Sequence, residues 1–251
     1  MANLSIFDLT GRKAIVTGAC SGLGKGMAEG LLEAGASVAV IDFNKNVTEI
    51  ADSFGARGYF ADVTDFAQIK TVFDQVAADL GGLDILVNSA GMTLREESDK
   101  MDMNNWRRIM SLNVDSVMHL CKLAANIMIP QRYGKILNMA SMTSYFGVPY
   151  SVGYSTSKGA VMQMTKSLAD EWAQYGIRVN ALAPGYMDTP LCSGITQSED
   201  QTRFQQLSQR IPVGRWGRPE DLKGAAVFLC SEASEYVNGV ILPVDGGFLG
   251  R

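Results

Sequence analysis

The sequence has almost no histidine. Only His119 occurs among 251 residues, inside the helical pattern SVMHLCKLAA, where a structural side chain is expected. A typical zinc site needs several histidines or clustered cysteines. The cysteines are instead scattered, without a CxxC pair, at Cys20, Cys121, Cys192 and Cys230. The sequence therefore predicts no metal site, and it excludes both zinc-dependent and histidine-based acid–base chemistry.

Long apolar runs and blocks of one charge are also missing. No run reaches the roughly 18 residues that span a bilayer, and MANLSIFDLTGRK lacks the basic start and apolar block of a signal peptide. The formal net charge is −4 with acids and bases interspersed, which gives no sign of nucleic-acid binding. Scattered cysteines favour a reducing compartment. We therefore expect a cytoplasmic protein that binds neither membrane nor nucleic acid.

Short β-branched runs alternate with longer helical patterns along the whole chain. Strands are expected at 13–18, 37–42, 58–63, 84–91, 134–141, 177–185 and 239–247, and helices at 24–35, 66–81 and 154–176. Near-continuous apolar strands separated by helices predict a parallel sheet covered on both faces. Neither a Pro- or Ser-rich linker nor a repeat interrupts the pattern. The fold class is therefore α/β, a single doubly wound Rossmann-type domain over residues 1–251 with a seven-stranded parallel sheet.

The unusual residues gather at the expected carboxyl ends of the strands, where such folds bind ligands. TGACSGLG follows the first strand, Asp42 ends the second, Asp62 the third, and NSAG the fourth. Ser141 ends the fifth strand and PGYMDT follows the sixth. One binding site at this edge of the sheet is therefore predicted.

The loop TGACSGLG carries glycines at 18, 22 and 24, a spacing that differs from the GxGxxG fingerprint. Small residues there permit a tight turn and let a phosphate approach the next helix; the alternative is an ordinary glycine-rich turn. Asp42 lies where a carboxylate would bind the adenosine ribose hydroxyls and repel a 2′-phosphate, although it could equally cap a turn. Because no basic residue lies in Ala19–Ser21 and Phe43 follows the acid, NAD(H) is favoured over NADP(H).

The stretch YSTSK places Tyr154 and Lys158 at i and i+4, on one face of a helix. An unperturbed phenol titrates near pH ~10, and a fixed ammonium beside it would lower that pKa towards neutrality. The alternative is a surface phenol next to a solvated ammonium. Ser141, thirteen residues earlier, would then hydrogen-bond a substrate oxygen.

These motifs, in this order and over nearly the whole chain, resemble the short-chain dehydrogenase/reductase family in its short single-domain branch. NMASM, WAQYGIRVNALAPGYMDT, RIPVGRWGRPEDL and VDGGFLGR are similar to its bacterial dehydrogenases of sugars, sugar acids and polyols. One departure is Ser89 in NSAG, where the family more often has asparagine.

The resemblance implies NAD-dependent hydride transfer that interconverts a secondary alcohol and a ketone on a sugar, sugar acid or polyol. Its catalytic residues would be Asn113, Ser141, Tyr154 and Lys158. Two alternatives stay open: a 3-oxoacyl-thioester reductase and a non-catalytic NAD-binding protein.

The resemblance also implies the remaining sites and the assembly. The cofactor would contact Gly18, Ser21, Gly22, Leu23, Gly24, Asp42, Phe43, Asp62, Val63, Asn88, Ala90, Gly91, Tyr154, Lys158, Pro184, Gly185, Met187 and Thr189. The small-molecule substrate would contact Ser141, Thr143, Tyr145, Tyr154 and Tyr186, with Met142, Thr93 and Arg95 nearby by position. Residues 188–212, polar and weakly patterned over 192–212, would form a mobile lid, and the protein would be a homotetramer.

Overall fold

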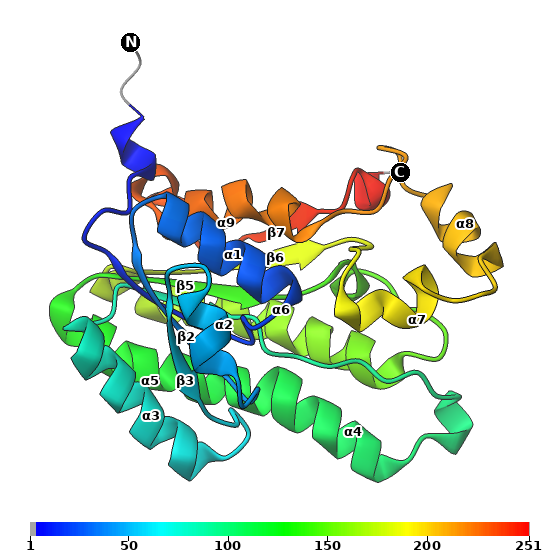
Figure 1. Ribbon diagram of the computed structural model, residues 1–251, viewed down its shortest axis with the longest axis horizontal. Helices are drawn as coiled ribbons and strands as arrows, with labels where there is room; N and C mark the ends of the chain where they lie inside the picture. Colours follow the sequence, from blue (N-terminus) through cyan, green and yellow to red (C-terminus); the bar gives the residue numbers. More distant parts are fainter. Residues whose placement is uncertain (1–3, 251) are drawn as a thin grey trace.

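A seven-stranded parallel sheet forms the centre of the molecule (Figure 1), as the sequence predicts. The computed structural model describes residues 4–250; the first three and the last residue of the expected domain lie outside this range. The strand order is β3-β2-β1-β4-β5-β6-β7. The strands are β1 Lys13–Thr17, β2 Ser37–Asp42, β3 Arg57–Phe60, β4 Ile85–Asn88, β5 Gly134–Met139, β6 Ile177–Pro184 and β7 Ile241–Val244.

Several strands are shorter than their apolar runs. β3 ends at Phe60, so Asp62 lies two residues beyond the strand rather than at its tip. β5 ends at Met139, and Ser141 begins the short 3-10 helix Met142–Ser144. The chain leaves the sheet before these polar residues, which places them in loops above the strand ends.

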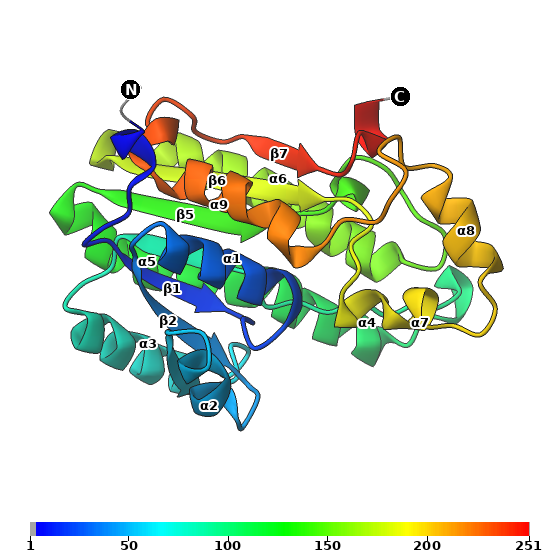
Figure 2. The same cartoon turned by 45° about the horizontal axis from the view of Figure 1, so that its top comes forward.

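Helices cover both faces of the sheet. One face carries α1 Gly22–Glu33, α2 Val47–Asp52 and α9 Lys223–Cys230, and the other carries α3 Phe66–Leu80, α5 Ser116–Gln131 and α6 Val152–Trp172. Figure 2 shows this layering from a second direction. Within residues 4–250, no helix combines the length and apolar character needed to cross a membrane.

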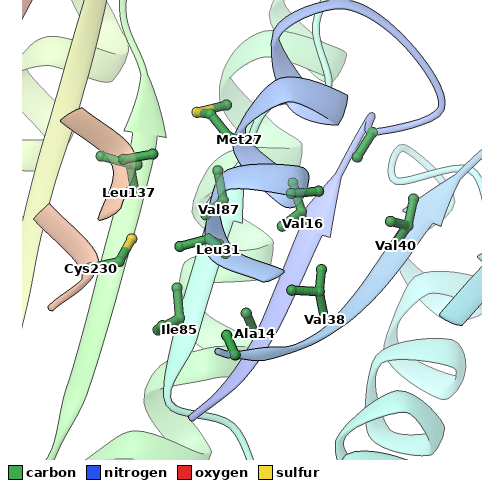
Figure 3. Packing of buried hydrophobic residues seen from close by; sticks show 14 of the residues in the cluster. Ala14, Val16, Met27, Leu31, Val38, Val40, Ile85, Val87, Leu137 and Cys230 are labelled. Atoms are coloured by element: carbon green, nitrogen blue, oxygen red, sulfur yellow. The ribbon is translucent and has the colours of Figure 1, made fainter. Parts of the chain in front are cut away.

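Each face of the sheet has its own hydrophobic core. The apolar run of each buried strand contributes to both cores, because its side chains alternate between the faces. Figure 3 shows Met27 and Leu31 of α1 above Val16, Val87 and other valines of the sheet. Ile15 of the same strand packs into the opposite core. The sheet is therefore fixed from both sides, and its strand ends give a stable base for the loops.

Helix ends follow local sequence signals. The Asp65 side chain caps α3 by accepting hydrogen bonds from the backbone N–H groups of Ala67 and Gln68. Gly81 ends the same helix at φ 73°, the left-handed conformation that glycine adopts without steric cost.

The chain between β4 and β5 contains a helix with an interruption. α4 spans Met103–Met110, and Ser111–Asp115 forms a π-helical turn before α5 begins. Such turns occur frequently at functional sites. The turn holds Asn113 fully buried, one of the four residues expected to be catalytic.

The amino-terminal edge of the sheet carries an ion pair between a buried lysine and a half-exposed glutamate. Lys135 at the start of β5 is 1% exposed, and its ammonium lies 2.9 Å from a Glu235 carboxylate oxygen. The same carboxylate binds Arg178 of β6 at 2.7 Å. A buried lysine at this edge is thus neutralised by a carboxylate.

Candidate active site

A cleft of about 770 Å³ opens above the carboxyl ends of the strands. The strand arrows in Figure 2 point towards this end of the molecule, where α4, α7 Ser193–Thr196 and α8 Thr202–Ser208 lie. Of the residues expected to bind cofactor, those lining the cleft are Gly18, Ser21, Gly22, Leu23, Gly24, Asp42, Phe43, Asp62, Val63, Ala90, Gly91, Tyr154, Lys158, Pro184, Gly185, Met187 and Thr189. The structure thus brings segments from the whole chain to one site.

Close packing explains two of the loop glycines. Gly18 has φ 66°, and a Cβ there would lie 2.6 Å from the Ala90 Cα. A Cβ at Gly24 would lie 2.3 Å from the Gly18 carbonyl oxygen. Both distances are shorter than any side chain tolerates, so only glycine lets the loop turn between β1 and α1.

The Asp42 carboxylate is fixed at the end of β2. Oδ2 accepts a hydrogen bond of 3.0 Å from the Cys20 backbone N–H, and Oδ1 accepts one of 2.9 Å from Asn44 N–H. The residue is 7% exposed and lines the cleft. Burial, followed by the Asp42 charge, raises the pKa of the Cys20 thiol to about 12, so this thiol stays protonated.

The NSAG turn is hydrogen-bonded to β1, and its last residues, Ala90 and Gly91, line the cleft. Thr17 Oγ1 accepts hydrogen bonds from the backbone N–H groups of Ser89 and Ala90, at 3.2 and 3.3 Å. A Cβ at Gly91 would lie 3.8 Å from Lys158 Nζ and 3.3 Å from Asn113 Oδ1. Glycine therefore keeps the space in front of the lysine amine open.

Asn88, which the resemblance assigns to the cofactor site, turns its side chain into the sheet. Its Nδ2 donates to Asn138 Oδ1 at 2.9 Å, inside the sheet, and the residue is 2% exposed. Cys121 of α5 accepts from the same amide at 3.3 Å. Asn88 therefore holds the end of β4 against β5 and lies beneath the cleft, because partners from distant segments draw its amide inward.

Tyr154 and Lys158 lie one turn apart in α6, as the spacing predicts. The Lys158 ammonium donates a hydrogen bond of 2.6 Å to the Met139 carbonyl at the end of β5 and lies 5.7 Å from the centre of the Tyr154 ring. The lysine is 6% exposed, and burial lowers its pKa to about 8. Both side chains line the cleft.

The expected lowering of the tyrosine pKa is not what the structure gives. Burial raises the pKa of Tyr154 to about 12, while hydrogen bonding with Ser141 acts in the opposite direction. Desolvation of the phenolate is therefore the dominant effect, and the Lys158 amine is bound to a backbone carbonyl. At neutral pH the phenol is protonated.

Ser141 is held beside Tyr154 by the turn that follows β5. Its Oγ accepts a hydrogen bond of 3.2 Å from Thr143 N–H. The Ser144 hydroxyl accepts from Ser141 N–H at 3.3 Å and donates to the Lys158 carbonyl at 2.7 Å. Ser144 thus fixes the distance between this turn and α6, and a sequence motif that stops at Ser141 misses it.

Asn113 is bound on three sides. Its Oδ1 accepts from Met92 N–H and its Nδ2 donates to the Met92 carbonyl, both at 2.9 Å. Nδ2 also donates to Ser157 Oγ at 3.0 Å, and Ser157 donates to the Tyr154 carbonyl at 2.7 Å. Asn113 therefore joins the loop after β4, the π-helical turn and α6, and its side chain does not line the cleft.

The expected substrate residues lie in different surroundings. Ser141 and Tyr154 line the cleft, whereas Thr143, Tyr145 and Tyr186 are outside its wall. The Tyr145 hydroxyl donates to the Ile241 carbonyl at 2.8 Å. Thr143 Oγ1 is buried and has no hydrogen-bond partner within residues 4–250.

Segment 188–212 lies over one side of the cleft. Thr189, Pro190, Leu191 and Cys192 form part of its wall. α8 packs on an aromatic cluster in which the Phe204 and Trp216 rings are stacked with centres 5.2 Å apart. Sequence patterning missed this packing because Trp216 lies outside the segment itself.

Within residues 4–250, no group of three His, Cys, Asp or Glu side chains is arranged to hold a metal ion. His119 stacks on Phe66 with ring centres 4.7 Å apart. The lone histidine is a packed helix residue, as expected.

Comparison with known proteins gives consistent results. Residues 18–249 match a family model described as Enoyl-(Acyl carrier protein) reductase. The chain is 43% identical over 253 residues to 2-dehydro-3-deoxy-D-gluconate 5-dehydrogenase of Dickeya dadantii (strain 3937), with 99% of each chain covered. It is 40% identical over 253 residues to gluconate 5-dehydrogenase of Gluconobacter oxydans (strain 621H), with 98% of each covered.

A solved structure gives the same result in three dimensions. Gluconate 5-dehydrogenase from Burkholderia cenocepacia J2315, described as a complex with NADP and tartrate, is 38% identical and superposes with a TM-score of 0.94. The match covers 99% of both chains.

Proposed function

The chain belongs to the short-chain dehydrogenase/reductase family, and from this premise we propose that it interconverts a secondary alcohol and a ketone on a sugar acid, using NAD(H). The relatives named above act, by their names, on gluconate or a dehydro-deoxygluconate. Identity of 40% or more over the whole chain supports the same substrate class here.

One observation carries the proposal: Ser141, Tyr154 and Lys158 line the same cleft as the glycine loop and Asp42. A proton donor therefore lies within one cavity of a site built for a dinucleotide. A cofactor-binding protein without catalytic activity would have no need for a buried, unpaired lysine beside a buried phenol.

The residues present fit a nicotinamide dinucleotide. Gly22 presents no side chain where the loop meets Thr189, and α1 begins at Gly22, so backbone N–H groups face the phosphate position. Asp42 and Asp62 would lie at the adenosine end, and Gly91 and Lys158 at the nicotinamide end. A bound nicotinamide supplies the acceptor or donor of the hydride.

The proton is handled by side chains of this chain. Tyr154, protonated at neutral pH, donates its proton to the substrate oxygen during reduction and takes one back during oxidation. Ser141 hydrogen-bonds that oxygen as charge develops on it. Lys158, charged below about pH 8, stabilises the phenolate that forms when the proton leaves. Because the pKa of Tyr154 is raised, oxidation should accelerate with increasing pH.

Asp42 supports NAD over NADP. A 2′-phosphate would lie against a carboxylate that two backbone N–H groups hold in place, so the carboxylate cannot turn away without losing both hydrogen bonds. The Burkholderia relative is described with NADP. The preference for NAD is thus a proposal for this chain alone.

Three further features belong to the proposal. α8 packs on an aromatic cluster that is separate from the two cores of the sheet, which supports its role as a mobile lid over substrate. A homotetramer is proposed from the family resemblance. The four cysteines are unpaired, which supports a reducing, cytoplasmic environment.

The test is a steady-state assay of the purified protein with NAD or NADP and a panel of aldonates, ketoaldonates and polyols. We expect turnover of a sugar acid, a higher kcat/KM with NAD, and a rate that increases up to alkaline pH. Tyr154→Phe should lower turnover about 10²- to 10⁴-fold with unchanged NADH binding by fluorescence.

Two results would contradict the proposal. Preferred turnover of an acetoacetyl thioester with NADPH would identify a 3-oxoacyl-thioester reductase instead. NADH binding without turnover of any substrate on the panel would favour the non-catalytic alternative.

A further inference from the structure

The segment 188–216, which includes the expected lid, begins and ends at one pair of residues. Met187 and Gly217 form an isolated parallel bridge. The Asp188 N–H donates a hydrogen bond of 2.8 Å to the Gly217 carbonyl, and the Gly217 N–H donates one of 2.9 Å to the Tyr186 carbonyl. Met187 also forms part of the wall of the cleft. The two ends of the segment are therefore bonded to each other directly beside the cleft.

Gly217 leaves the space that the Met187 side chain occupies. A Cβ at Gly217 would lie 2.9 Å from the Met187 Cε and closer still to Sδ, which is too close for any Cβ atom. The next nearest atom, Asp221 Oδ2, is at an ordinary 3.7 Å. The φ angle of Gly217 is outside the left-handed region, so alanine can adopt this backbone. Within residues 4–250, the Met187 thioether is thus what a side chain at this position would meet.

The chain on both sides of Gly217 is held by one carboxylate. The Arg215 guanidinium donates two hydrogen bonds to the Asp221 carboxylate, at 2.7 and 2.8 Å. The backbone N–H of Arg218 donates to the same carboxylate at 2.7 Å. These hydrogen bonds resist a shift of the backbone at Gly217.

The stretch that follows Gly217 is packed against helix α1. A Cβ at Gly26 of α1 would lie 2.7 Å from the Pro219 carbonyl oxygen, so the helix and the stretch touch without an intervening side chain. Leu222 is fully buried in the core that also contains Met187. A side chain at position 217 would therefore displace the Met187 thioether rather than its own backbone.

The displaced thioether has room on the cleft side only. Met187 is 4% exposed and belongs to the core between the sheet and α1. Protein cores are close-packed and do not accept the end of a methionine without strain. The cleft of about 770 Å³, whose wall includes Met187, is open space. The thioether would therefore move into the cleft.

We propose that Gly217 is a positioning residue for cofactor binding: because it lacks a side chain, it keeps the Met187 thioether out of the cleft that receives the nicotinamide dinucleotide. This inference rests on the proposed function, which supplies the cofactor. A side chain at position 217 would weaken cofactor binding while the fold is kept, since the strain is relieved into the cleft.

The test compares Gly217→Ala with Gly224→Ala as the matched control. Gly224 is in α9, and a Cβ there would meet nothing within 4 Å among residues 4–250, so the control adds the same methyl group without a clash. Fluorescence titration of each purified protein with NADH measures cofactor affinity, and thermal unfolding measures the fold.

We expect the Kd for NADH to rise about 5- to 100-fold in Gly217→Ala, because the cost of overpacking is transferred to the binding site. Gly224→Ala should keep the wild-type Kd. The melting temperature of Gly217→Ala should stay close to that of the wild type.

Removing the thioether isolates its contribution. Adding Gly217→Ala to Met187→Ala should leave the Kd for NADH at the value of Met187→Ala alone, because no thioether remains to be displaced. Gly217→Ala/Met187→Leu, with a shorter side chain at position 187, should show an intermediate Kd. These variants keep the test decisive if Gly217→Ala itself fails to fold.

The outcomes separate this inference from the proposed function. An unchanged Kd in Gly217→Ala, or an equal rise in Kd when the substitution is made in wild type and in Met187→Ala, would overturn the positioning role and leave the function standing. A Kd that follows the expected pattern in a protein that turns over no substrate of the panel would support the positioning role and overturn the function.

Discussion

A buried lysine amine lies at each end of β5, one from the strand itself and one from helix α6, in opposite electrostatic surroundings. At the amino end, Lys135 is 1% exposed and lies 2.9 Å from the Glu235 carboxylate. At the carboxyl end, Lys158 is 6% exposed and donates to the Met139 carbonyl, with no acidic partner within residues 4–250. One strand thus holds a neutralised and an unneutralised cation.

In the proposed mechanism, Lys135 serves the fold and Lys158 serves the reaction. A buried cation without a carboxylate destabilises the folded protein, and the lowered pKa of Lys158 reports that cost. A carboxylate beside Lys158 would remove the cost, but it would also cancel the positive charge that stabilises the Tyr154 phenolate. The cleft therefore keeps its cation unpaired.

The largest expected effect comes from removing the unpaired cation. Lys158→Met should lower kcat/KM about 10²- to 10⁴-fold, because the phenolate of Tyr154 loses its nearest positive charge. The melting temperature should stay equal or increase, because an uncompensated buried charge is removed. Steady-state kinetics and thermal unfolding measure the two effects.

Lys135→Met is the matched control for this variant. It removes the buried amine at the opposite end of β5, and turnover should stay near the wild-type value. A Lys158→Met protein that is strongly destabilised, or a Lys135→Met protein that loses turnover, would contradict the distinction between the two amines.

A change of pH should have a smaller effect, which acts on the free energy of unfolding. Below about pH 8 Lys158 is protonated in both the folded and the unfolded protein. Between about 8 and ~10.4 the folded protein loses this proton while the unfolded chain keeps it. Since the unfolded chain then binds more protons, the free energy of unfolding increases with pH through this window, by up to about 3 kcal/mol.

Urea unfolding at several pH values, for wild type and Lys158→Met, isolates this contribution as the difference between the two proteins. The stability advantage of the variant should shrink as the pH rises from 8 to 10. A difference that is constant with pH would show that Lys158 is not a desolvated cation.

The smallest effect is expected at the paired lysine. Glu235→Gln leaves the Lys135 ammonium buried and beside Arg178, and should lower the free energy of unfolding by about 1–2 kcal/mol. The loss is modest because the Glu235 side chain is 52% exposed and partly screened by solvent. Chemical denaturation measures it, and turnover should not change.

The double variant Lys135→Met/Glu235→Gln provides the control. It should recover most of the lost stability, because the buried lysine charge is gone and only the partly exposed Arg178 lacks its carboxylate partner. Equal stability of Glu235→Gln and wild type would show that the carboxylate is not what makes the buried lysine tolerable.

The sequence predicts the fold because the relevant signals are local. Apolar runs locate the seven strands, and the i, i+4 spacing puts Tyr154 and Lys158 on one face of α6. The polar residues that follow the strands converge on one cleft because parallel strands end at one edge.

The sequence does not show where a side chain forms hydrogen bonds with a distant segment. Asn88 turns inward to Asn138, fifty residues away in the chain. The Tyr145 hydroxyl binds the carbonyl of Ile241. The pKa of Tyr154 rises because several segments enclose it, which no spacing within α6 reveals.

The π-helical turn Ser111–Asp115 determines whether the protein can tolerate the deletion of a residue between α4 and α5. It accommodates one residue more than a regular helix would, and each residue of an α-helix rotates the following face by about 100°. A single-codon deletion there would straighten the helix and swing Ile109 and Trp106 of α4 away from Gly153, against which they now pack. The length of the turn is therefore fixed, because the packing of two helices depends on that one additional residue.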